Sequence, residues 1–145
     1  MPMGGSGAMP ACSTGLMPGA VAVSLRRRRD RVRLLFQHDP KEPVGIWDTL
    51  REDGHGLFVA GRLVPGVARA DALRRLIEQG ALDGLSIGFR TLRATREGGV
   101  RKLWQIDLFE ISIVTFPMME DARIAPSQVS AGAAIAAATH TIRNR

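Results

Sequence analysis

Ser86 lies in the segment DGLSIGFR, between two apolar residues and with a glycine two positions away on each side. A serine hydroxyl attacks a carbonyl carbon only when a neutral imidazole within hydrogen-bond reach takes its proton, and a third group must orient that imidazole. If Ser86 is a nucleophile, the chain must therefore supply a histidine and an orienting partner. The alternative interpretation is packing, because a small residue fits a crowded strand.

The segment 84–88 also fits the pattern G-x-S-x-G, the nucleophile elbow of α/β-hydrolases. In that fold a strand precedes the serine and a helix follows it, whereas here a helical pattern precedes Ser86 and an alternating pattern follows. The hydrolase order of serine, acid and histidine would also leave only His140 as the base. The α/β-hydrolase interpretation is therefore rejected.

An alternating strand gives Ser86 a different setting. Leu85, Ile87 and Phe89 are expected on one face, which leaves Ser86, Gly88 and Arg90 on the other. Glycines on both sides of a serine would clear space for a substrate backbone.

Three histidines could act as the base. His140 lies in an alanine-rich tail, and His55 lies in a Gly-His-Gly turn that we expect to be exposed. His38 ends an apolar alternating stretch just before a forced turn, which predicts a fixed, semi-buried position. The competing interpretation of His38 is a hydrogen-bonded histidine at a strand end, without a catalytic role.

An orienting acid is available in QIDLFEISIVTFP, residues 105–117. Simple alternation places Glu110 and Ser112 on one face with Ile106, Leu108 and Val114, and Asp107 on the other. A carboxylate in so apolar a strand needs a partner, because burial of an unpaired charge is unfavourable. That partner is either an arginine in a structural salt bridge (Arg90, Arg93 or Arg101) or a histidine in a catalytic site.

The elements that must position these residues are mostly strands. Alternating patterns predict strands ending at His38 and over residues 44–53, 57–64, 85–94 and 100–115. Residues 67–82 repeat apolar side chains at helical spacing, with Gly80 as the stop, and residues 20–30 are compatible with a short helix. The predicted strands and helices do not alternate along the chain as they do in βαβ units. This order predicts a mainly β, α+β fold: a small closed or nearly closed antiparallel β-barrel with one central helix.

Composition sets the limits of the domain. The chain has 145 residues, a formal charge of +6 and one cysteine. We expect an unstructured or divergent start over residues 1–19, one domain over 20–126, and a low-complexity tail over 127–145. No disulfide framework, metal site, cofactor or membrane segment is expected. The basic run at residues 26–29 lacks any accompanying nucleic-acid motif, so we expect no nucleic-acid partner.

Five blocks of the sequence, in order, resemble one known family. They are LLFQHDP, PVGIWDTLRED, GLFVAGRL, GALDGLSIGFR and QIDLFEISIVTFPMMEDARI, and the likeness covers roughly residues 14–125. The family is that of the prohead (capsid-maturation) serine proteases of tailed phages and gene transfer agents. A single block would be unspecific, whereas five in the right order are not.

The resemblance implies a fold like that of the herpesvirus proteases and a catalytic order of histidine, serine and a third member. Carried over, it makes His38 the general base, Ser86 the nucleophile and Glu110 the orienting residue, with Asp107 as the runner-up. It places oxyanion stabilisation in the block that contains Arg123.

The resemblance also implies partners and a location. The expected substrates are the major capsid protein and the scaffold, with possible self-cleavage and a possible homodimer. The expected location is the assembling procapsid in the bacterial cytoplasm. The alternative function is a non-catalytic capsid assembly or scaffold module that keeps the protease fold.

Overall fold

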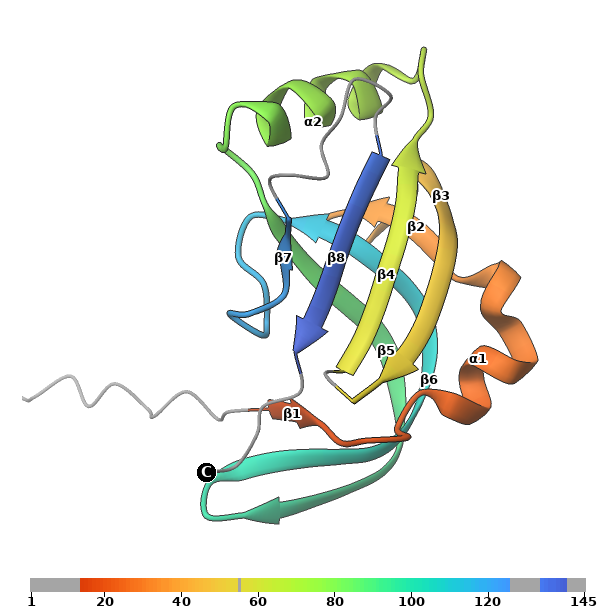
Figure 1. Cartoon of the computed structure of the whole chain (residues 1–145), viewed down its shortest axis with the longest axis vertical. Helices are drawn as coiled ribbons and strands as arrows, with labels where there is room; N and C mark the ends of the chain where they lie inside the picture. The colour runs from red at the N-terminus through yellow and green to blue at the C-terminus, as the bar shows by residue number, and fades with distance from the viewer. Residues whose placement is uncertain (1–13, 55, 126–133, 141–145) are drawn as a thin grey trace, which may run out of the picture.

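The structure, a computed structural model, describes residues 14–54 and 56–125, together with the backbone of residues 134–140. This part of the chain is mainly β, with two α-helices and one short 3-10 helix. Its strands form one strongly curled sheet, with α2 across one end and α1 on one flank (Figure 1). The α+β class predicted from the sequence is confirmed. The structure has a second α-helix, α1, in addition to the predicted central helix.

The elements have the following bounds, in chain order. They are β1 (Thr14–Leu16), α1 (Ala22–Arg28), the 3-10 helix η1 (Arg29–Arg31), β2 (Arg33–Phe36), β3 (Asp39–Asp53), β4 (Gly56–Leu63), α2 (Ala68–Glu78), β5 (Gly84–Glu97), β6 (Val100–Val114), β7 (Arg123–Ile124) and β8 (Ala134–His140).

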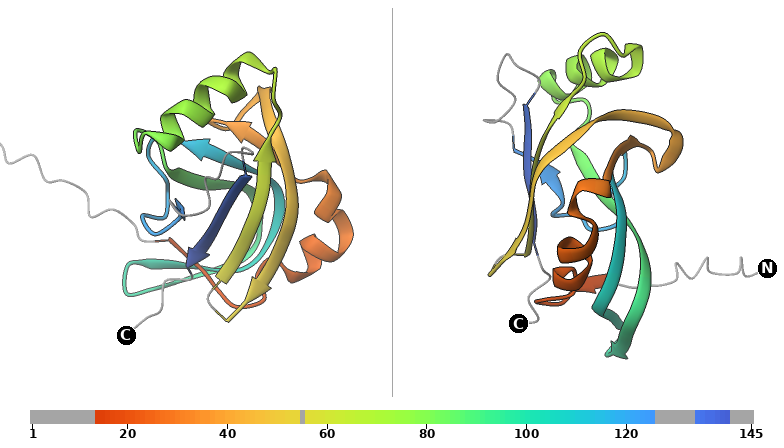
Figure 2. Two further views of the ribbon diagram at one scale, coloured as in Figure 1. Left: turned by 45° about the horizontal axis from the view of Figure 1, so that its top comes forward. Right: turned by 90° about the vertical axis from the view of Figure 1, so that its right-hand side faces the viewer.

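The sheet has the strand order β1-β6-β2-β3-β4-β8-β7-β5, and β5 also pairs with β6. The strong curl of this sheet is visible in Figure 2. The links through β7 are short, with one residue pair to β5 and two to β8. Because these links are so short, the closed barrel and its herpesvirus-protease likeness stay predictions. The prediction of a wholly antiparallel sheet is wrong, because β1 and β2 both pair in parallel with β6.

Two segments outside the expected strands belong to the sheet. Residues 14–16, predicted to be unstructured, form β1 and pair in parallel with β6. The alanine-rich tail, predicted to be of low complexity, supplies β8, which pairs with β4 from Gly56 to Arg62. Alanine has a high helix propensity. Here the unpaired edge of β4, which offers a row of backbone hydrogen-bond partners, overrides that local preference.

A β-bulge in β6 changes which side chains face the core. Gly88 pairs with Glu110 and Phe89 pairs with Leu108, so Phe109 is the extra residue on β6. The simple alternation predicted for this strand is wrong for this reason. The core receives Ile106 and Leu108 before the bulge, and Ile111 and Ile113 after it. Glu110 and Ser112 consequently project from the opposite face.

Helix α1 fills a gap along one edge of β6. β1 and β2 pair with the same edge of β6, at residues 101–103 and 110–113. Between them the Ile106 N–H donates to the Ala20 carbonyl (3.0 Å), and the Leu108 N–H donates to the Ser24 hydroxyl (2.8 Å). These bonds satisfy strand groups that would otherwise lack a partner.

The start of α1 is held by a carboxylate from β3. Glu52 Oε1 accepts the Val21 N–H at 3.1 Å. Burial raises the pKa of Glu52, and the backbone hydrogen bonds from Val21 and Gly19 oppose that shift. A carboxylate beside the free N–H groups of a first helical turn is favourable, so Glu52 fixes α1 against β3.

Helix α2 covers one end of the curled sheet, where it contacts β3 and β4 (Figure 1). Ala70, Leu73 and Ile77 point inward at helical spacing. Gly80, with φ +74°, ends the helix, and the Ala81 N–H returns to the Leu76 carbonyl at 2.9 Å. Within the described residues, no helix combines the length and the apolar character needed to cross a membrane.

Candidate active site

His38 lies in a two-residue turn between β2 and β3. Gln37 and His38 both have positive φ, at 54° and 59°, and Phe36 pairs with Asp39 around them. This is the backbone of a type I′ hairpin, which normally uses Asn and Gly. The prediction of a semi-buried strand end is wrong, because the His38 side chain is 42% exposed and occupies the turn itself.

Contacts with the end of β6 hold this strained turn. The Gln37 N–H donates to the Ile113 carbonyl (2.9 Å), and the Gln37 side-chain amide donates to the Thr115 hydroxyl (3.0 Å). The His38 N–H donates to the Ser112 hydroxyl (3.1 Å). Non-glycine residues in this conformation cost about 1–3 kcal/mol each and persist only where the surroundings fix them. The turn thus places one imidazole at a fixed position over β6.

The His38 ring contacts the carboxylate of Glu110. Its Nδ1 is hydrogen-bonded to Glu110 Oε1, and the Ser112 hydroxyl donates to Glu110 Oε2 at 2.6 Å. The Glu110 side chain is only 13% exposed. With a carboxylate as acceptor, Nδ1 carries the proton and Nε2 of a neutral imidazole is left as an acceptor.

Ser86 lies on the neighbouring strand, directly opposite Ser112 in the β5–β6 ladder. Opposed residues of an antiparallel pair have Cβ atoms about 4.5–5.5 Å apart and project to the same face. Ser86 is 7% exposed. Among the described residues, no hydrogen bond joins its hydroxyl to another side chain, so this hydroxyl stands free beside the residue that anchors His38.

The glycines around Ser86 have a different use from the one predicted. A Cβ on Gly88 would collide with the Glu110 carboxyl group, and a Cβ on Gly84 would lie 2.9 Å from the Pro117 ring. The space that we assigned to a substrate backbone is filled by these side chains. Gly88 instead allows the Glu110 side chain to lie across β5.

A small apolar hollow of about 10 Å³ adjoins Ser86. Two of its lining residues, Met118 and Met119, come from the loop after β6, and Met118 is about half exposed. Methionine side chains adapt their shape readily, so this wall of the hollow can adjust to a bound group. The complete lining is Leu16, Leu85, Ser86, Ile87, Met118, Met119 and Ala122.

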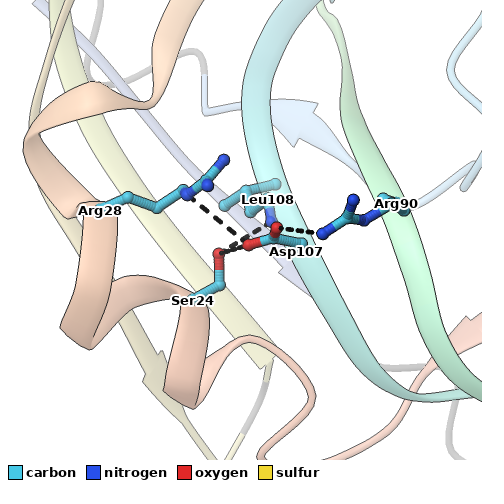
Figure 3. Close-up of polar contacts among 5 residues, drawn as sticks. All are labelled: Ser24, Arg28, Arg90, Asp107 and Leu108. Atoms are coloured by element: carbon cyan, nitrogen blue, oxygen red, sulfur yellow. Dashed lines mark hydrogen bonds and ion pairs between the residues drawn. The ribbon is translucent and has the colours of Figure 1, made fainter.

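Asp107, the runner-up for the third role, has other partners. Figure 3 shows its carboxylate between Arg28 of α1 and Arg90 of β5, with Ser24 beside it. The nitrogen–oxygen distances are 3.6 Å to Arg28 and 3.3 Å to Arg90. Arg90, considered from sequence as a partner of Glu110, is thus engaged by Asp107. This cluster ties α1 to the two strands.

The remaining candidates lie elsewhere. The guanidinium of Arg123 donates to Asp83 and to the Glu120 carbonyl, both at 2.8 Å, and its backbone pairs with Gly84. Arg123 therefore lies opposite Gly84, the first residue of β5 and two positions before Ser86. His55 is outside the described residues, and for His140 only the backbone, paired with Gly56, is described.

Sequence reasoning assigned no role to Ser112. The sequence contains one hint, because Ser112 and Glu110 are two positions apart in an otherwise apolar strand. Both residues contact His38, which lies in the turn that follows β2, and β2 pairs in parallel with β6. A parallel pairing between segments more than 70 residues apart leaves no local pattern in the sequence.

Two comparisons with known proteins identify the family of this chain. Residues 5–135 match the family model of the caudovirus prohead serine proteases. The prohead protease of Enterobacteria phage HK97 is 38% identical over 115 residues, which cover 76% of this chain and 51% of that protein. The chain thus spans about half the length of this relative. No solved structure matches the chain. The chain belongs to the caudovirus prohead serine protease family.

Proposed function

We propose that this chain is a serine endopeptidase that processes capsid protein and scaffold during prohead maturation. In this proposal Ser86 is the nucleophile, His38 the general base and Glu110 the orienting carboxylate. The observation that carries it is the hydrogen bond between His38 Nδ1 and Glu110, made on the face of the sheet to which Ser86 projects. Family membership supports the same reaction class.

The proposed reaction begins when His38 Nε2 accepts the proton of the Ser86 hydroxyl as its oxygen attacks a peptide carbonyl carbon. The imidazolium keeps its Nδ1–H on Glu110, whose negative charge stabilises the positive ring. Collapse of the tetrahedral intermediate breaks the C–N bond, and His38 gives its proton to the leaving amine. Water then attacks the acyl-enzyme by the same steps, releasing the acid and restoring Ser86.

Access to the nucleophile fits a gated site. Ser86 is almost fully buried, and Met118 and Met119 line the hollow that adjoins it. We propose that an extended peptide displaces these two side chains and brings the imidazole onto the hydroxyl. Catalytic hydrogen bonds are often absent in the free enzyme and form in the complex.

The family connection extends the proposal to fold and setting. We propose a closed barrel of the herpesvirus-protease type over residues 20–126, in which β2 runs parallel to β6 and the tail completes the sheet by pairing with β4. We also propose that the protein acts inside the assembling procapsid in the bacterial cytoplasm, that it can cleave itself, and that it forms a homodimer.

The test is co-expression with the major capsid protein of the same virus, with capsid processing followed by intact mass. We expect a truncated capsid product, its absence with Ser86→Ala and with His38→Ala, and its persistence with the control His55→Ala. Thermal melts of the purified variants establish that each one is folded. Normal capsid processing by folded Ser86→Ala would instead identify the chain as a non-catalytic assembly module.

A further inference from the structure

Ser112 has the least exposed polar side chain described in this protein, at 0% relative exposure. It lies in β6 between Ile111 and Ile113, which are both core residues. A buried hydroxyl without partners would destabilise the fold, and this one has two. Its oxygen accepts the His38 N–H at 3.1 Å, and it lies 2.6 Å from Glu110 Oε2.

The direction of these bonds follows from the chemistry of the groups. A backbone N–H can only donate, so the Ser112 oxygen accepts from His38. The single hydroxyl proton is then free to be donated to Glu110 Oε2, while Glu110 Oε1 accepts from the His38 ring. The three hydrogen bonds form a closed cycle: the His38 backbone donates to Ser112, Ser112 donates to Glu110, and Glu110 accepts from the His38 ring.

We infer that Ser112 is a positioning residue for the reaction proposed above, on which this inference rests. Its hydroxyl holds the plane of the Glu110 carboxylate in one orientation, and the same oxygen accepts a hydrogen bond from the His38 backbone. Because His38 sits at positive φ, its turn depends on such contacts to keep its conformation. Ser112 acts only through Glu110 and His38, and its burial keeps it from the substrate.

A second buried serine, Ser24 of helix α1, provides a matched comparison. The Ser24 oxygen accepts the Leu108 N–H at 2.8 Å, and its hydroxyl lies 3.4 Å from Asp107 Oδ1. Ser24 is also buried, at 3% exposure. Both serines thus link a backbone N–H to a carboxylate of β6, but only Ser112 is linked to an imidazole.

The experiment compares Ser112→Ala with Ser24→Ala in the full chain. We expect Ser112→Ala to lower kcat about 10- to 100-fold, as for the loss of one hydrogen bond to a charged group, with KM unchanged. The Nδ1–H proton resonance of His38, assigned with His38→Ala, should shift upfield or vanish by exchange with water. Ser24→Ala should lower the melting temperature and leave both kcat and this resonance unchanged.

A double variant tests whether Ser112 acts through Glu110. We expect Ser112→Ala combined with Glu110→Gln to be no slower than Glu110→Gln alone, because the two changes remove parts of one arrangement. If Ser112→Ala is too unstable to assay, Ser112→Cys provides a nearly isosteric replacement with a weaker donor. It should then show the same upfield shift.

The outcomes separate this inference from the proposed function. Unchanged kcat and an unchanged His38 resonance in Ser112→Ala would overturn the positioning role while Ser86-dependent cleavage remained. Equal rate losses in Ser112→Ala and Ser24→Ala, or additive losses in the double variant, would overturn it as well. Cleavage by Ser86→Ala would instead overturn the proposed function, and the resonance would still report whether Ser112 orders His38.

Discussion

Asp107 and Glu110 are two carboxylates of one strand, three positions apart and on either side of the bulge at Phe109. Each accepts a hydrogen bond from a buried serine. Asp107 is then paired with the guanidinium groups of Arg28 and Arg90, whereas Glu110 is paired with an imidazole.

The arginines that pair with Asp107 and the imidazole that pairs with Glu110 differ in whether they can exchange a proton. An arginine keeps its charge at every physiological pH, so the Asp107 cluster is a permanent electrostatic clamp. An imidazole nitrogen can accept a proton and release it again during a reaction, so a histidine paired with Glu110 suits proton transfer. The same carboxylate chemistry therefore serves attachment of α1 at one site and, in our proposal, proton transfer at the other.

The largest effect that would sharpen this comparison is expected from Glu110→Gln. The amide offers one acceptor oxygen, so it cannot accept from both His38 and Ser112 on separate oxygens. We expect kcat to fall about 10²- to 10⁴-fold, as when an orienting carboxylate becomes an amide, with little change in melting temperature. Steady-state kinetics on a capsid-derived peptide measure this, and a near-normal rate would remove Glu110 from the third role.

Asp107→Asn should show the opposite profile. It removes both ion pairs of α1 and β5, which are partly exposed, so we expect a loss of about 1–2 kcal/mol in the free energy of unfolding. The rate constant should stay within about twofold of wild type, because Asp107 is bound to arginines and not to His38. Urea unfolding and kinetics on one preparation test both parts. A large rate loss with normal stability would move the orienting role to Asp107.

The smallest effect concerns Glu52, which, like Asp107, is a carboxylate that holds α1. Its pKa is raised by burial, so the folded state favours the protonated form. The stability contributed by this group is present below the ordinary carboxyl value of 4.5 and is lost as pH rises through the raised value. Glu52→Gln keeps an acceptor for the Val21 N–H and has no charge to bury.

We therefore expect Glu52→Gln to be at least as stable as wild type at pH 7. Its advantage should shrink as pH falls towards 4.5, since wild-type Glu52 then becomes protonated. Melting temperatures of both proteins across this range measure the effect. A difference that does not change with pH would mean that Glu52 carries no burial penalty.

Local patterns predicted several elements well. The helical spacing in residues 67–82 and the stop at Gly80 correspond to α2, and the alternating pattern over residues 85–94 lies within β5. These features depend on residues close in the chain, so propensity and periodicity describe them. The bulge at Phe109 depends on how β6 pairs with β5, and the tail strand β8 depends on pairing with β4, which is distant in the chain. Periodicity within one segment describes neither of them.

The sequence by itself determined the chemical inventory: a histidine, a serine and two acids in five ordered blocks that identify the family. It left open which acid meets the histidine. The tertiary structure decided that, because the bulge turned Glu110 away from the core and the parallel pairing of β2 with β6 brought the His38 turn over it. The environment of a carboxylate is set by neighbouring strands, and strand neighbours more than 70 positions apart are chosen only when the sheet folds.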